Sequence, residues 1–258
     1  MSYPRRILAK LKHAVQSRVP GAAPDPETAT GLDLNPIYDR LTSEIIRAHV
    51  APGTIAIDVG ANVGGIVAEL VSHAPSARHL AFEPIPHLAA KVRATYPSVS
   101  VHEVALAAEA GELEFHHVRD LPDYSGLRQR TYPDGVGDVE LITVAVRRLD
   151  DVIAEDAAGE TISLIKIDVE GAELGVLQGG RQTIETHRPL VVFEHGVGGA
   201  NHYGTEPEHV WDFFAEIGFG LSTLQAFTSG GAPLTRDEMH EQYHRGTNYY
   251  FIAHPPTT

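Results

Sequence analysis

Six carboxylates and one imidazole follow apolar segments that have the composition of buried β-strands. They are Asp58, Glu83, Glu103, Asp168, Glu170, Glu194 and His195. If the strands are parallel, their carboxyl ends meet at one edge of a sheet, and open α/β sheets bind their ligands there. Because negative charges gathered at one edge repel one another, the pattern favours a cationic ligand or proton transfer at this edge.

A glycine-containing turn follows the first of these strands, in the segment DVGANVG at residues 58–64. Gly60 permits a tight turn, Asn62 tolerates left-handed backbone geometry, and Gly64 lets the next helix begin close to a ligand. Dinucleotide-binding proteins have G-x-G-x-x-G here and hold a pyrophosphate at the helix N-terminus. An aspartate two residues before the first glycine would repel phosphate, so this turn suits a cation such as an amino group or a sulfonium.

Glu83 lies about 20 residues beyond the turn, where a carboxylate can bind both hydroxyls of a ribose. A turn that tolerates a cation, followed by an acid that binds ribose, predicts S-adenosylmethionine as the cofactor.

Apolar strands alternate with amphipathic helices along most of the chain, which indicates parallel βαβ units. We predict strands at 54–59, 79–82, 99–104, 163–167, 190–193, within 219–227 and at 248–253, and helices at 37–50, 63–73, 86–96, 172–186 and 206–217. Asn35 should cap the first helix, with Pro36 in its first turn. Alternating apolar and polar residues at 112–118 and 139–147 predict an inserted antiparallel pair, and 228–246 should be a long polar loop that could cover a site.

Composition favours one α/β domain at residues 32–258, preceded by a basic leader and linker at 1–31. The net charge is −14, and the 34 acidic residues disfavour nucleic acid as a partner. No apolar run is long enough to span a bilayer, and cysteine is absent, so we expect a cytoplasmic protein. The leader could pack as a helix or lie on a membrane or a partner.

Five segments resemble the FkbM-type family of class I S-adenosylmethionine-dependent methyltransferases, in its order and spacing. They are IDVGANVG, AFEPIP, VALAAEAGELEF, LIKIDVEGAELGVLQGG and RPLVVFEH, which together cover roughly residues 54–195. The resemblance implies a Rossmann-like, mostly parallel sheet of seven strands in the order 3-2-1-4-5-7-6, with the last strand antiparallel and helices on both faces. It also implies O-methyl transfer to a hydroxyl, often on a sugar or a natural product.

The resemblance also implies roles for individual residues. The loop around the methionine part of the cofactor would contain Asp58, Gly60, Ala61, Asn62 and Gly64, with Asp168 facing the same part; Glu83 and Pro84 would bind the ribose, and Val104 and Ala105 would flank the adenine. YSGL at 124–127 resembles the family's serine-containing loop, which makes Ser125 a weaker candidate.

A hydroxyl acceptor must lose its proton as the new bond forms, so a general base is expected. Imidazole has the ordinary pKa closest to neutrality, and we therefore favour His195, with Asp168 or Glu170 orienting it or the acceptor. In the alternative, Glu194 or Asp168 is the base. Because neighbouring residues of a strand face opposite sides, only one of Glu194 and His195 should face the acceptor.

The acceptor should be a small hydroxylated molecule that enters between segments 196–205 and 227–246. Polar and aromatic side chains that could contact it are Tyr124, Asn201, His202, Tyr203, Tyr243 and His244. The chain could also form a homo-oligomer, which the sequence does not decide.

The sequence leaves two other functions and a metal cofactor as alternatives. The chain could be an NAD(P)-dependent oxidoreductase, or an inactive methyltransferase fold that serves as an interaction module. A divalent metal held by Asp168, Glu194 and His195 could activate the acceptor hydroxyl. We do not favour a metal, because scattered histidines are usually surface residues.

Overall fold

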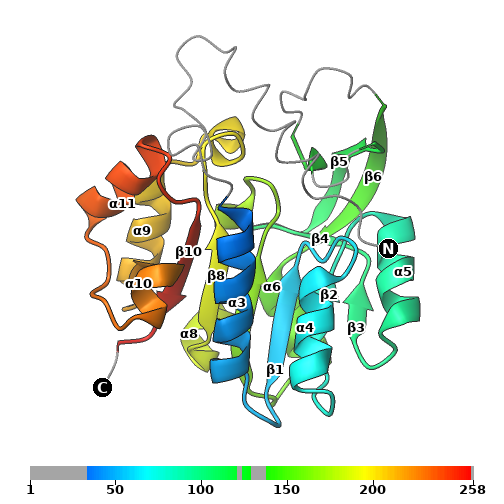
Figure 1. Ribbon diagram of the computed structural model, residues 1–258. Coiled ribbons are helices and arrows are strands. Elements are labelled where there is room, and N and C mark those ends of the chain that lie inside the picture. Colours follow the sequence, from blue (N-terminus) through cyan, green and yellow to red (C-terminus); the bar gives the residue numbers. More distant parts are fainter. Residues whose placement is uncertain (1–33, 121–123, 129–137, 257–258) are drawn as a thin grey trace.

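A twisted sheet of seven strands forms the centre of the computed structural model, which describes residues 34–120, 124–128 and 138–256 (Figure 1). The strands are β1 (Ile55–Val59), β2 (Leu80–Phe82), β3 (Ser100–His102), β7 (Ile162–Ile167), β8 (Leu190–Glu194), β9 (Gly220–Thr223) and β10 (Tyr250–His254). Their order is β3-β2-β1-β7-β8-β10-β9, and β10 runs antiparallel to both of its neighbours. The predicted leader and linker, 1–31, lies outside the described residues.

A second, smaller sheet explains why these strand numbers differ from the predicted order. β4 (Ala105–Leu106), β5 (Gly111–Val118) and β6 (Val139–Arg147) form a sheet of their own in the order β4-β6-β5. β5 and β6 are the predicted antiparallel pair, whereas the parallel pairing of β4 with β6 was not predicted. The predicted 3-2-1-4-5-7-6 counted only the strands of the large sheet, in which β7, β8, β9 and β10 come fourth to seventh along the chain.

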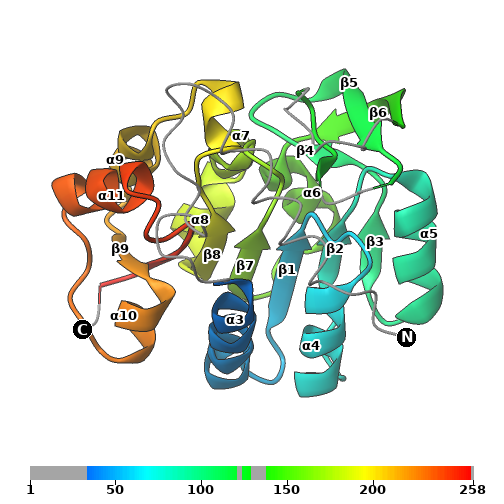
Figure 2. The same ribbon diagram turned by 45° about the horizontal axis from the view of Figure 1, so that its top comes forward.

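Helices cover both faces of the large sheet (Figures 1 and 2). One face packs against α3 (Asn35–His49), α4 (Gly65–His73), α5 (Pro86–Thr95) and α10 (Leu224–Thr228). The other packs against α6 (Leu149–Asp156), α7 (Glu173–Gly179), α8 (Arg181–His187), α9 (Pro207–Glu216) and α11 (Arg236–His244). Among the described residues, no helix is both long enough and apolar enough to cross a membrane.

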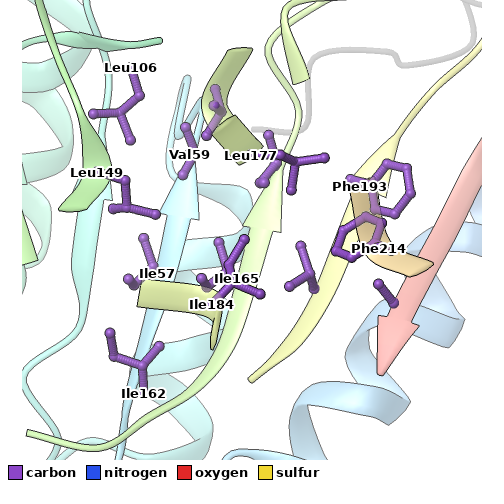
Figure 3. Packing of buried hydrophobic residues seen from close by; sticks show 14 of the residues in the cluster. Ile57, Val59, Leu106, Leu149, Ile162, Ile165, Leu177, Ile184, Phe193 and Phe214 are labelled. Carbon is purple, nitrogen blue, oxygen red and sulfur yellow. The ribbon is translucent and has the colours of Figure 1, made fainter. Parts of the chain in front are cut away.

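Alternation along the strands divides the core into two layers. In β1, Ile57 and Val59 join the cluster beneath α6 to α9, where Ile184 and Phe214 also pack (Figure 3). Ala56, which precedes Ile57, joins the cluster beneath α3 and α4. Successive side chains of a strand point to opposite faces, so this parity also fixes the direction of the residues at each strand end.

Several predicted elements need correction. Asn35 does not cap α3, because the helix begins at Asn35 itself and the Asn35 Oδ1 accepts a hydrogen bond of 2.9 Å from the Tyr249 hydroxyl. The helix predicted at 172–186 is two helices separated at Gly180. Segment 228–246 is not a loop throughout, since it contains α11, and the short helix α10 follows β9 within 219–227. α6 was not predicted.

Candidate active site

The turn after β1 has the left-handed backbone that its residue types predicted. φ is +83° at Gly60, +47° at Asn62 and +87° at Gly64. The backbone N–H groups of Gly60 and Ala61 both donate to the carbonyl oxygen of Phe82, at 3.0 Å, which ties the turn to the end of β2. The turn is therefore held in shape by the neighbouring strand.

Gly60 also allows the ends of β1 and β7 to approach closely. A Cβ atom at this position would lie 1.9 Å from the carbonyl oxygen of Asp168, a distance that no side chain could tolerate. The Asp168 N–H donates to the carbonyl oxygen of Val59 at 3.0 Å, so the backbone strands remain paired up to the turn. The sequence predicted a tight turn at Gly60, and the structure adds this contact as a second reason for glycine.

Glu83 holds the turn from the other side. Its Oε2 accepts from the Asn62 N–H at 2.7 Å, and its Oε1 accepts from the Ile85 N–H at 2.8 Å. Burial raises the pKa of Glu83 to about 7, against the lowering effect of these two hydrogen bonds. Each carboxylate oxygen retains a second lone pair, so this side chain can still accept a hydrogen bond from a ligand.

Asp58 is a buried carboxyl group without a hydrogen-bond partner among the described residues. Its side chain is 1% exposed, and neither of its oxygens is hydrogen-bonded. Burial raises its pKa to about 6, although the nearby Lys166 ammonium acts in the opposite direction. A buried polar group that lacks a partner is costly, and such groups in a native fold call for an explanation such as a ligand.

Asp168, the first residue after β7, has several partners. Its Oδ2 accepts from the Lys166 Nζ at 3.0 Å and from the Tyr250 hydroxyl at 2.6 Å, and Glu194 is hydrogen-bonded to it as well. Burial opposes ionisation of Asp168, but Lys166 and these hydrogen bonds outweigh it and hold its pKa below the usual range. Asp168 is therefore a carboxylate fixed in one orientation.

Carboxylates of three residues meet at this edge of the sheet. Oxygens of Asp168, Glu170 and Glu194 lie within 4.8 Å of one another. Glu170 lies two residues after Asp168 and has a positive φ of +59°, a conformation uncommon outside glycine. The sequence predicted this cluster from the strand ends, and the structure brings the three residues together.

His195 does not belong to this cluster. Strand parity places Glu194 on the α3 face with Asp168, and it places His195 on the opposite face with Phe193. The His195 ring is fully buried, packs against Tyr243 at a centroid distance of 5.1 Å, and has no hydrogen-bond partner among the described residues. Burial lowers its pKa to about 3. The structure does not support His195 as the base, because an acceptor cannot reach the ring in this conformation.

The predicted adenine and ribose neighbours form the side of the site towards the small sheet. Pro84 is half-buried after β2, while Ala105 is buried as the first residue of β4 and packs with Ile85 and Phe115. Val104 is half-buried between β3 and β4. Ser125 has a structural role, because its Oγ accepts from the Val118 N–H at 3.0 Å.

The predicted acceptor residues separate into two groups. The 124–128 segment, which contains Tyr124, lies beside the short helix η2 (Ala200–Tyr203), since the Arg128 guanidinium lies 5.7 Å from the Tyr203 ring centroid and a Cβ at Gly126 would lie 3.3 Å from the Tyr203 hydroxyl. Asn201 and His202 also belong to η2, and Asn201 Oδ1 accepts from the Gly198 N–H at 2.7 Å. Tyr243 is buried against His195, and His244 lies on the exposed side of α11.

Two partners of Asp168 were not identified from the sequence, and one pair of histidines that the sequence does show was overlooked. Lys166 lies within an apolar strand, and Tyr250 is a residue type common in strands. Their contacts with Asp168 depend on the register between strands, which the sequence does not reveal. The histidine pair, by contrast, was visible, because HEQYH at 240–244 places His240 and His244 four residues apart.

Comparisons with known proteins agree on the family. The model of the methyltransferase FkbM domain matches residues 58–221. The 2-O-methyltransferase NoeI of Sinorhizobium fredii is 29% identical over 163 residues, which is 56% of this chain and 65% of that protein. Methyltransferase sdnD of Sordaria araneosa is 30% identical over 163 residues, which is 51% of this chain and 62% of that protein.

A solved structure is also similar, the methyltransferase FkbM from Methylobacillus flagellatus, with a TM-score of 0.47 and 16% identity over 97% of this chain and 59% of that one. The match to the two curated relatives extends over less than two thirds of either protein. The family model, however, matches well over half of the chain, from the aspartate of the glycine turn to β9. The chain therefore belongs to the FkbM methyltransferase family.

Proposed function

We propose that the protein transfers a methyl group from S-adenosylmethionine to a hydroxyl of a small acceptor, such as a sugar or a natural product. One observation carries the proposal: two buried carboxyl groups, Asp58 and Glu83, flank a glycine turn at the carboxyl edge of the sheet. Phosphate groups would be repelled here, whereas a cofactor with a positive charge and a ribose would be bound.

The residues present fit this cofactor. The unpartnered carboxyl group of Asp58 can receive a cationic group, and Glu83 has lone pairs left for the ribose hydroxyls. Gly60 lets the ends of β1 and β7 approach closely, because a Cβ there would lie 1.9 Å from the Asp168 carbonyl oxygen. When bound, S-adenosylmethionine supplies an electrophilic methyl group on a sulfonium.

A carboxylate at the same edge is the base in this proposal. Glu194 and Asp168 are in contact on the face of the sheet that carries Asp58, and two carboxyl groups in contact strongly disfavour double ionisation. Lys166 and Tyr250 keep Asp168 charged and oriented. When Glu194 is ionised, repulsion by the charged Asp168 favours its protonated form, so Glu194 takes up the hydroxyl proton as the oxygen attacks, and much of the remaining rate enhancement comes from positioning.

Two features support a hydroxylated small molecule as the acceptor. A relative of 29% identity is named a 2-O-methyltransferase, and the chain has an excess of acidic residues, which disfavours nucleic acid. Membership of a methyltransferase family counts against the oxidoreductase alternative, as does the carboxyl group of Asp58 where a pyrophosphate would lie. The intact carboxylates count against an inactive interaction module.

The proposal is tested by incubating the protein with methyl-labelled S-adenosylmethionine and a panel of hydroxylated sugars, lipids and macrocycles. We expect label in a base-stable methyl ether, with S-adenosylhomocysteine formed in equal amount. Transfer to a nitrogen, or no transfer to any hydroxyl by a protein that binds S-adenosylhomocysteine, would contradict O-methylation.

A further inference from the structure

α9 and α11 form an antiparallel helix pair at one side of the molecule (Figure 1). Arg236 at the start of α11 makes a two-pronged ion pair with Asp212, with Nε–Oδ1 at 2.8 Å and Nη2–Oδ2 at 3.0 Å. The Trp211 indole N–H donates to the carbonyl oxygen of Leu234 at 3.2 Å. These contacts fix the register in which the two helices face each other.

This register places two histidines opposite two glutamates. His240 and His244 lie one turn apart on α11, and their ring centroids are 4.2 Å from each other. His240 Nδ1 is in contact with Glu208 on the first turn of α9, and His244 Nε2 lies 3.9 Å from the Oε2 of Glu206 at the N-cap. Two imidazoles and two carboxylates therefore gather at one end of the helix pair.

We propose that His240, His244 and Glu208 bind a divalent transition-metal ion, with Zn²⁺ the best match, which clamps α11 to α9. Two imidazoles and a carboxylate are a donor set that Zn²⁺ prefers, and an i, i+4 histidine pair on a helix presents both rings to one ion. In the structure the side chains form two neighbouring pairs, His240 with Glu208 and His244 with Glu206. His240 and His244 are half exposed, and the proposal requires their side chains to rotate so that the three donors surround one ion.

The site is a clamp and not the centre of a metalloprotease. In helices with the H-E-x-x-H pattern that hydrolyse peptides, the glutamate acts as the general base beside the metal. Here Glu241 is exposed and its Oε2 lies 3.4 Å from the Arg245 guanidinium, on the outer surface of the same helix. The carboxylate cluster at the sheet edge is a different place in the fold, where the Lys166 ammonium already lies 3.0 Å from Asp168.

A metal at this position would act on the segment that leads into the active site. Tyr243, between the two histidines in sequence, packs on His195 at a centroid distance of 5.1 Å. The chain then continues from α11 into β10, whose first residue, Tyr250, donates to Asp168. The clamp does not depend on the proposed methyl transfer, and it can be tested without any acceptor.

The test uses the full chain without a histidine tag, stripped with a chelator and titrated with Zn²⁺ in competition with a chromogenic chelator. We expect one Zn²⁺ per chain, and an affinity at least about tenfold weaker in His240→Ala and in His244→Ala. Glu241→Gln, in the same motif, and His73→Ala, an exposed histidine on α4, are matched controls that should bind as the wild type does. Equal affinity in all four variants, or no binding to the wild type, would overturn the proposal. So would loss of binding in Glu194→Gln alone, which would assign the ion to the carboxylate cluster.

A second readout tests the clamp itself. Amide hydrogen exchange in residues 236–244 should slow when Zn²⁺ is added to the wild type and should be unchanged by Zn²⁺ in His244→Ala. If Zn²⁺ binds with the expected affinities but leaves exchange in α11 unchanged, the ion is a surface ligand and not a clamp.

Discussion

Replacing Asp58 with asparagine should stabilise the folded protein while weakening cofactor binding. Asparagine has nearly the same shape as aspartate but cannot ionise, so the variant removes the buried charge and leaves the packing around it unchanged. Asp58 has no hydrogen bond to lose among the described residues, which makes this an unusually direct test of a buried carboxyl group.

The magnitude follows from the pKa of Asp58, which burial raises from 3.8 to about 6 against the effect of Lys166. One pKa unit corresponds to about 1.4 kcal/mol, so ionising this group in the folded chain costs about 3 kcal/mol. Because the folded pKa is the higher one, the folded state holds a proton that the unfolded state releases. Stability from this group is fully present below pH 3.8 and is lost as the pH rises through about 6.

Urea denaturation of both proteins without cofactor measures the effect. Asp58→Asn should be more stable by about 3 kcal/mol near pH 8 and by about half as much near pH 5. Calorimetric titration with S-adenosylhomocysteine near pH 8 should show weaker binding by the variant, because a charged partner is lost. Equal stability of the two proteins at both pH values would refute the burial argument, and unchanged affinity would refute the assignment of Asp58 to the cofactor.

Three further predictions concern other positions. Glu83→Ala should weaken S-adenosylhomocysteine binding at least tenfold, since a charged acceptor is worth roughly 1.5–3 kcal/mol; an unchanged Kd in calorimetry would contradict its role. Gly60→Ala should lower the free energy of unfolding more than Gly53→Ala. Both glycines have φ near +82°, but only at position 60 would a Cβ meet a backbone oxygen, at 1.9 Å. Equal losses of unfolding free energy in urea denaturation would show that this close contact does not matter. Glu194→Gln should lower turnover by roughly 10² to 10⁴, whereas His195→Ala should keep turnover within about tenfold and mainly reduce stability; the reverse ranking would return the base role to the imidazole.

The sequence predicted the alternation of strands and helices because local apolar periodicity and the residue types at strand ends indicate it directly. The turn at 58–64 could also be predicted, since glycine and asparagine at set positions imply left-handed backbone whatever the surroundings. Glu83 was expected near this turn, and it is hydrogen-bonded to it through Asn62. α11 could not be recognised as a helix from periodicity, because its few apolar residues do not form a stripe, although Thr235 and Glu238 form a capping box at its start.

The choice between Glu194 and His195 shows what the sequence could not provide. Parity required that the two face opposite sides, but which side carries the site depends on the register of β8 with β7 and β10. The same register brings Tyr250, some 80 residues away in the chain, onto Asp168. Long-range pairing of this kind leaves no local pattern, so the partners of a strand-end carboxylate became visible only in the fold.

The most direct test of the central claim, that the turn after β1 and the ends of β2 and β7 hold the cofactor, is amide hydrogen exchange with and without S-adenosylhomocysteine. Exchange should slow in residues 58–65, 83–85 and 168–171 when S-adenosylhomocysteine is added, and it should be unchanged in α6, which is buried against the opposite face. NAD at the same concentration should have no effect. Protection that is absent from these three segments, or that NAD produces equally well, would contradict the account.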